Sequence, residues 1–168
     1  RLLVGGQIDA SSGEGVGGTI ALSSPDTRIT NAQVNASGAL MGGTILITAP
    51  TSQTPTASST NVDPGAPAPT PKAPMLAISG NTVIRSGSSR GYGGAIALTS
   101  DQINLSDTVQ LTATGDLAGG LVLVGGNYQG GVIDGTQNAN AVLVGKDVLI
   151  DASATSFGNG GLVVVWSE

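Results

Sequence analysis

Residues 42–49 read GGTILITA, and this phrase of two glycines followed by alternating aliphatic residues decides the fold. Variants recur as GGTIALSS at 17–24, GGAIALTS at 93–100, GGLVLVGG at 119–126 and GGLVVVW at 160–166. The second glycines lie 25, 51, 26 and 41 residues apart, and both longer steps contain an insertion. A period of about 20–50 residues is typical of solenoid proteins, so the repeat indicates that class.

The residues two and four positions past each second glycine form the first aliphatic column. Successive side chains of a strand point to opposite faces, so the two residues of each pair point the same way. We expect these positions to form the core ladder: Ile20, Leu22, Ile45, Ile47, Ile96, Leu98, Val122, Val124, Val163 and Val165.

Two further phrases accompany each Gly-Gly phrase. The phrase before it places a second set of side chains inward: Ile8, Ala10, Val34, Ala36, Ile84, Ser86, Leu111, Ala113, Ile150 and Ala152. The polar residues between them are expected to face solvent: Asp9, Asn35, Arg85, Thr112 and Asp151. A weaker third phrase supplies Ile29, Leu76, Ile78, Ile103, Leu105, Val142 and Val144.

Three short strands in about 25 residues predict an all-β, parallel β-helix of about five to six coils over residues 1–168. Coils would stack at about 4.8 Å, piling small aliphatic side chains into one core. This explains why the chain has only one Trp, one Phe and two Tyr. Glycine, Asn, Asp and Ser would supply positive-φ corners. A β-sandwich of short strands is the alternative, but it does not require the same residue class at one offset five times.

Composition excludes several kinds of chemistry. The net charge is −5 and the six basic residues are scattered, so the sequence has no basic patch of the kind that binds nucleic acid. No apolar run is as long as a membrane-spanning helix, so no membrane insertion is expected. The absence of Cys and His removes thiolate chemistry, disulfides and the commonest general base and metal ligand. We expect no enzyme, no cofactor, and no catalytic, cofactor-binding or metal-binding residue. The chain begins at Arg1 with no signal peptide, which favours a processed chain or a piece of a longer one.

Two insertions interrupt the repeat. Residues 50–74 are rich in Pro, Thr, Ser and Ala, and are expected to form an extruded loop or an extended strap, which is either simply solvated, or O-glycosylated or partner-binding. Residues 125–141 form the second insertion and contain Tyr128, which could stack on a sugar ring or lie over the outer surface.

The remaining candidate catalytic and binding sites have less support from the sequence. Paired carboxylates could act in a polysaccharide lyase or hydrolase, with Asp9, Asp107, Asp134 and Asp151 as candidates. Asp9 and Asp151 share a column but would stand four coils apart, about 19 Å, which is too far for one glycosidic bond. The GGVIDG fragment lacks the second copy of a calcium-binding nonapeptide, and the glycine-rich run at 87–94 leads into a strand and not a helix.

The outward face becomes apolar toward the end of the chain. Exposed apolar columns usually mark a contact, here with the 125–141 loop folding back, with a neighbouring chain or with further sequence, and uncapped strand edges invite pairing. We therefore expect end-to-end self-association or continuation into a longer chain. The residues expected to take part are Leu2, Val4, Leu121, Leu123, Leu162, Val164 and Trp166.

Residues 119–168 combine GG-x-Y-Q-G, an NA phrase, I-D-A-S-A and G-N-G-G-x-V-x-V-W. This combination resembles the repeat region of filamentous-haemagglutinin-like exoproteins, the adhesins exported by two-partner secretion, and QIDASSGEGVGGTI and QVNASGALMGGTILI are similar to shorter repeats of that family. The resemblance implies a right-handed β-helix at the bacterial cell surface or outside the cell, with a structural or adhesive role, and a host or cell-surface glycan as a candidate partner.

Two alternatives remain: a polysaccharide-binding or polysaccharide-degrading β-helix, and a trimeric phage fibre shaft.

Overall fold

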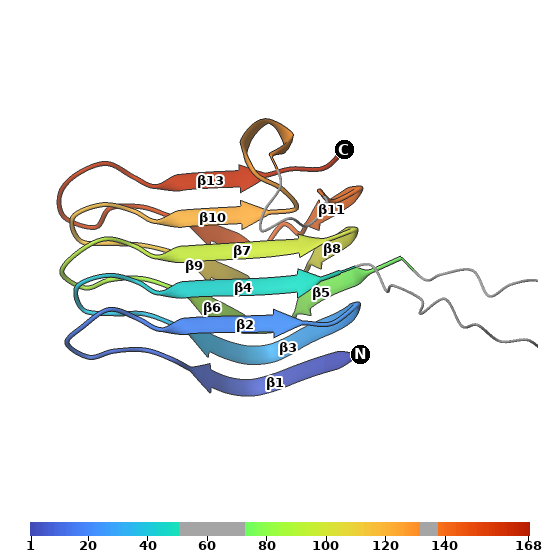
Figure 1. Cartoon of the computed structure of the whole chain (residues 1–168), viewed down its shortest axis with the longest axis horizontal. Coiled ribbons are helices and arrows are strands. Elements are labelled where there is room, and N and C mark those ends of the chain that lie inside the picture. Colours follow the sequence, from blue (N-terminus) through green and yellow to red (C-terminus); the bar gives the residue numbers. More distant parts are fainter. Residues whose placement is uncertain (51–72, 132–137) are drawn as a thin grey trace, which may run out of the picture.

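A computed structural model describes residues 1–50, 73–131 and 138–168, and this described part is all-β, with its strands parallel (Figure 1). One sheet contains β2 (Thr19–Ser23), β4 (Thr44–Ala49), β7 (Ala95–Ser100), β10 (Leu121–Val124) and β13 (Leu162–Val165). The other contains β1 (Leu2–Asp9), β3 (Asp26–Asn35), β5 (Met75–Ser79), β6 (Thr82–Arg85), β8 (Gln102–Leu105), β9 (Val109–Thr112), β11 (Ala141–Val144) and β12 (Leu149–Asp151). A single 3₁₀ turn, η1 (Tyr128–Gly130), is the only helical element among the described residues.

The five-stranded sheet is a register-matched stack of the Gly-Gly phrases. Its order is β13-β10-β7-β4-β2, and every neighbouring pair is parallel. The register aligns one residue from each strand into a single column: Ile20, Ile45, Ile96, Val122 and Val163. The predicted column is therefore a physical neighbourhood, with each residue beside its counterpart in the next phrase.

The eight-stranded sheet has two wings that meet in β3. The first half of β3 pairs with β5, and its second half pairs with β6. From there β5 leads to β8 and β11, whereas β6 leads to β9 and β12. β1 pairs along both halves of β3. The two other predicted phrases thus form the two wings.

One hydrophobic core lies between the sheets. Alternating side chains from the five-stranded sheet and from both wings join the same buried cluster, including Ile45, Ile78 and Leu111. Burial is incomplete at both ends of the stack: Leu22 in β2 is partly buried, and in β13 Val163 and Val165 are 43% and 46% exposed, whereas Val122 is fully buried. Because these two valines belong to the last described strand of the sheet, their exposure follows from their place in the stack.

Positive-φ corners occur where the two wings meet. Asn31, Gly80 and Asp107 have φ of 52°, 67° and 59°, one for each successive strand pair. Side chains lock the corners to one another, because Asn31 Oδ1 accepts from the Asn81 N–H at 3.0 Å and Asp107 Oδ2 accepts from the Gly80 N–H at 2.9 Å. The prediction of Gly, Asn and Asp corners is confirmed at this position.

The repeated Gly-Gly pairs have a different cause from the one predicted. None of their glycines has a positive φ. Instead, a methyl group placed on Gly43 would overlap the carbonyl oxygen of Gly18 and lie 2.6 Å from the carbonyl carbon of Gly17. Gly94, Gly120 and Gly161 meet the glycine carbonyl of the preceding phrase in the same way. Glycine is required at these second positions because successive backbones approach too closely there for a side chain.

The strand register continues across both predicted insertions. Ala49 and Met75 flank the 50–74 segment and pair with Ser100 and Gln102, which are separated only by Asp101. Residues 51–72 lie outside the described residues. The 125–141 segment joins β10 to β11, although Ala141 already belongs to β11, and its residues 132–137 also lie outside the described part.

We predict that Val122→Ala lowers the free energy of unfolding by about 2–3 kcal/mol, because it leaves a cavity in the closed part of the core. Val163→Ala, in the same column but half-exposed, should cost less than about 1 kcal/mol. Urea unfolding of both variants measures the difference. Equal losses would contradict the shared-column description.

The close approach at the Gly-Gly pairs gives a second prediction. Gly43→Ala should destabilise the chain by about 1–3 kcal/mol or more, since the added methyl meets backbone atoms that cannot rotate away. Gly160→Ala is the matched control, because a methyl there has no atom within 4 Å. Thermal unfolding monitored by circular dichroism compares the two, and an unchanged Tm for Gly43→Ala would refute the packing argument.

Candidate functional site

The outward face of one wing carries a column of polar side chains. The register aligns neighbouring residues of β1, β3, β6, β9 and β12 in this order: Asp9, Asn35, Arg85, Thr112 and Asp151. They alternate with buried residues such as Ile84 and Leu111, so strand geometry directs them outward. The predicted solvent-facing residues therefore lie side by side in one line.

A second outward column follows two residues further along each strand. Its members include Ser11, Ser37 and Ser153, whose N–H groups donate to the side-chain oxygen two residues earlier, at 2.8, 3.1 and 2.9 Å. Short Asp and Asn side chains favour this turn because they reach their own backbone. The same local bond thus holds the first column in place at both of its ends, Asp9 and Asp151, and at Asn35 beside Asp9.

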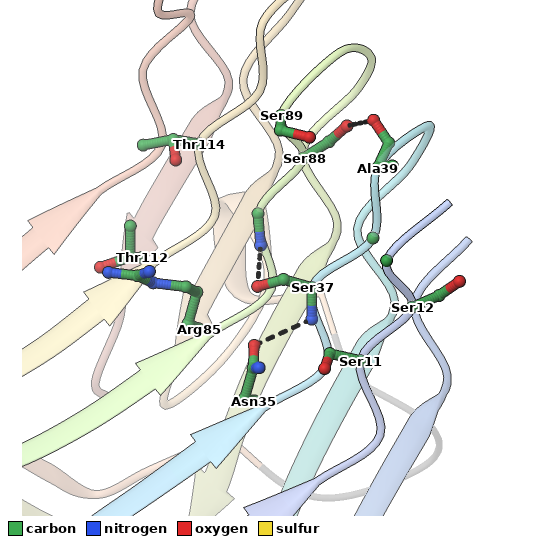
Figure 2. A pocket seen from close by; sticks show the side chains of 13 residues that line it. Ser11, Ser12, Asn35, Ser37, Ala39, Arg85, Ser88, Ser89, Thr112 and Thr114 are labelled. Atoms are coloured by element: carbon green, nitrogen blue, oxygen red, sulfur yellow. Dashed lines mark hydrogen bonds between the residues drawn. The ribbon is translucent and has the colours of Figure 1, made fainter. Parts of the chain in front are cut away.

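A pocket of about 490 Å³ lies over these columns and the adjoining loops (Figure 2). Its lining is dominated by hydroxyl groups, one amide and one guanidinium group. The lining residues are Ser11, Ser12, Gly13, Asn35, Ser37, Gly38, Ala39, Arg85, Gly87, Ser88, Ser89, Thr112 and Thr114.

Some of these hydroxyls also hold the loops that form the wall. Ser88 Oγ donates to the Ala39 carbonyl at 2.9 Å and accepts from the Gly91 N–H at 2.9 Å. Ser37 Oγ accepts from the Gly87 N–H at 3.3 Å, as Figure 2 shows. Two of the hydroxyls that line the pocket are therefore fixed by hydrogen bonds within and between the loops of its wall.

The charge of the pocket is concentrated on Arg85. It is the only charged residue among those that line the pocket. Asn35 and Thr112 flank it in the column, and Asp9 and Asp151 lie one strand further out on either side. At about 4.8 Å per strand, each carboxylate stands about 10 Å from the arginine position. The column thus has one positive charge at its centre, a neutral side chain on either side of that charge, and a negative charge at each end.

Asp9 is a well-stabilised carboxylate. The hydroxyl and the N–H of Ser11 lower its pKa below the ordinary value of 3.8, with smaller contributions from Asn35 and Gln7. The carboxylate is consequently ionised at neutral pH and remains so into the acidic range.

The structure does not bring the candidate catalytic carboxylates together. Asp9 and Asp151 occupy the same column with three residues between them, as the sequence predicted. Asp107 lies at a corner, bonded to the Gly80 N–H, and Asp134 lies outside the described residues. In residues 1–50, 73–131 and 138–168, no group of three or more His, Cys, Asp or Glu side chains could hold a metal ion.

The apolar column at the end of the chain is partly covered by the chain itself. Leu123 and Val164 are 4% and 8% exposed, which corrects the expectation that they are available for self-association. The Trp166 indole lies against the second insertion, since a methyl on Gly126 would be 2.9 Å from its Cδ1 atom. The Glu168 N–H donates to the Ala139 carbonyl at 2.9 Å, tying the two segments together.

Other predicted contact residues stay accessible. Leu162 is 47% exposed, while Leu2, Val4, Leu121 and Trp166 are partly buried. Tyr128 is 66% exposed in η1.

Sequence reasoning missed two features of the surface. It recognised the polar column but not the pocket, because much of the pocket's lining comes from the loops that follow the strands. It also missed an exposed apolar row on these loops, in which Val16, Met41 and Tyr92 are bridged in parallel. The residue before each Gly-Gly pair was the available signal for this row.

No family model, curated protein or solved structure matches this chain. Among the described residues, none of the helical structure has the length and apolarity that a membrane crossing requires.

We predict that Ser11→Ala raises the pKa of Asp9 toward 3.8, because it removes the largest stabilising contact of the carboxylate. The stabilisation of the fold by Asp9 is complete above pH 3.8 and is lost as the pH falls through its lowered pKa. Carbon-detected NMR titration of Asp9 measures the shift. Ser153→Ala is the control, and an unchanged Asp9 midpoint in Ser11→Ala would contradict the assignment.

Proposed function

We propose that this chain is a segment of a right-handed parallel β-helix that serves as a structural and adhesive rod. Three strands per coil and about 25 residues per coil account for the pairing of β1 with β3 and of β2 with β4. The two longer steps contain the insertions, which leave the strand register intact on either side. The observation that supports this proposal most strongly is the single in-register column from Ile20 to Val163.

The pattern of strand pairing supports the rod function. Each strand of the five-stranded sheet is bonded only to its neighbours above and below, so the structure is quasi-one-dimensional. Paired backbones and one continuous core resist bending along the axis. Secretion to the bacterial surface and kinship with filamentous-haemagglutinin-like exoproteins are part of this proposal, and they are supported by the phrases of residues 119–168.

The ends of the stack are suited to continuation. The edge strands of the two sheets are β1, β2, β11, β12 and β13. Val163 and Val165, two of the predicted core-ladder residues, are half-exposed. Unpaired strand edges with apolar residues favour pairing with another strand. In this proposal the stack continues through further coils of the same polypeptide or through a second copy.

The continuation proposal predicts that Val163→Asp combined with Val165→Asp abolishes end-to-end growth, because two carboxylates would be buried at the junction. Thr44→Asp adds charge at an exposed outward position and should not affect growth. Sedimentation and negative-stain electron microscopy compare the variants, and the mass of the native polypeptide identifies a longer chain. A native mass of 16.3 kDa together with discrete monomers only would overturn the proposal.

A second function is favoured by the pocket. Its hydroxyls, amide and guanidinium can each exchange hydrogen bonds with a polysaccharide, so a polysaccharide-binding β-helix is the alternative. Polysaccharide degradation has less support, because Asp9 and Asp151 are too far apart for a retaining or inverting pair. A trimeric fibre shaft would be revealed by light scattering.

A further inference from the structure

The pocket's charge pattern restricts what kind of glycan it can take. Arg85 is exposed and forms no ion pair with any described residue, so its guanidinium is free to bind an anion. A planar guanidinium recognises a carboxylate through two parallel hydrogen bonds. Figure 2 shows Arg85 reaching toward Thr112 along one side of the pocket.

The groups beside Arg85 suit neutral, hydroxyl-bearing parts of a ligand. Asn35 and Thr112 flank it along the column, and the serines of the adjoining loops complete the wall. Hydroxyl groups both donate and accept, which matches the hydroxyls of a sugar.

Two carboxylates of the column limit how far negative charge can extend along a bound ligand. Asp9 and Asp151 lie about 10 Å from Arg85 in the two directions along the axis. A ligand with charge on every sugar would place its neighbouring anions toward these carboxylates, and the net charge of −5 adds to the repulsion.

A peptide is less well matched to the pocket than a sugar. β3 and β6 lie beneath the pocket and are each paired on both sides, so they offer no free edge for an added strand. Ala39 is the only side chain of the lining that is purely apolar, so there is no hydrophobic anchor site.

We propose that the pocket binds a carbohydrate bearing one isolated carboxylate, seated on Arg85, with neutral sugar hydroxyls bound along Asn35, Ser37 and Thr112. This inference rests on the polysaccharide-binding alternative and is independent of whether the stack forms a rod.

Titration of the full chain by NMR with four probes tests the proposal. The probes are sialyllactose, a trisaccharide ending in glucuronic acid, neutral lactose and a heparin tetrasaccharide, at up to roughly 10 mM. At least one of the two single-carboxylate probes should bind about tenfold more tightly than lactose and more tightly than heparin. The first two probes distinguish a sialic acid from a uronic acid as the source of the carboxylate.

Two matched variants separate specific binding from general electrostatics. Arg85→Gln should weaken the single-carboxylate probe about tenfold, whereas Arg90→Gln removes the same charge from a residue outside the lining and should leave binding unchanged. Asp9→Asn with Asp151→Asn should strengthen heparin binding about two- to fourfold by removing the flanking repulsion. Asn retains the side-chain oxygen that accepts from Ser11 and Ser153.

The outcomes are distinguishable. Equal binding of lactose and the acidic probes overturns the carboxylate assignment but leaves glycan binding standing. Binding of none of the four probes overturns the glycan-binding function itself. Tightest binding of heparin with equal losses in Arg85→Gln and Arg90→Gln shows unspecific attraction and refutes the proposal.

Discussion

Parallel backbones that stack in register are the constraint on which this structure depends. Each strand must repeat the hydrogen-bonding positions of the strand beneath it, so the leucine, isoleucine and valine columns follow from the backbone pairing. The Gly-Gly pairs show how strict the constraint is. At Gly43 the neighbouring carbonyl of Gly18 both accepts the Thr44 N–H at 3.0 Å and occupies the space of a side chain.

The sequence predicted the core better than the surface. Alternation and a fixed offset from Gly-Gly sufficed to place Ile45 beside Ile96, because inward residues are dictated by strand periodicity. The burial of Leu123 and Val164 goes beyond this periodicity: alternation points both side chains outward, and cover by another part of the chain was one of three alternatives that the apolar column left open. The pocket was likewise missed, because alternation within a strand does not describe the loops that follow the strands and supply much of the pocket's lining.

The stack also determines what the surface can recognise. Outward side chains recur about 4.8 Å apart along the axis. Each strand contributes one side chain to the column, so replacing one residue changes one group and leaves the others in place. Replacing Asn35 or Thr112 by arginine would spread the charge over neighbouring strands, whereas the observed column concentrates it on Arg85. The outward column can thus hold one localised charge without any change in the core beneath it.

Distances between spin labels test the central claim most directly. With one label at Thr19 and a second at Ala95, Leu121 or Leu162, the account predicts distances that increase by about 5 Å for each strand added to the stack. The increments should be equal although the intervals along the chain are not. Distances that do not increase in this order, as in a β-sandwich, would contradict the register-matched stack.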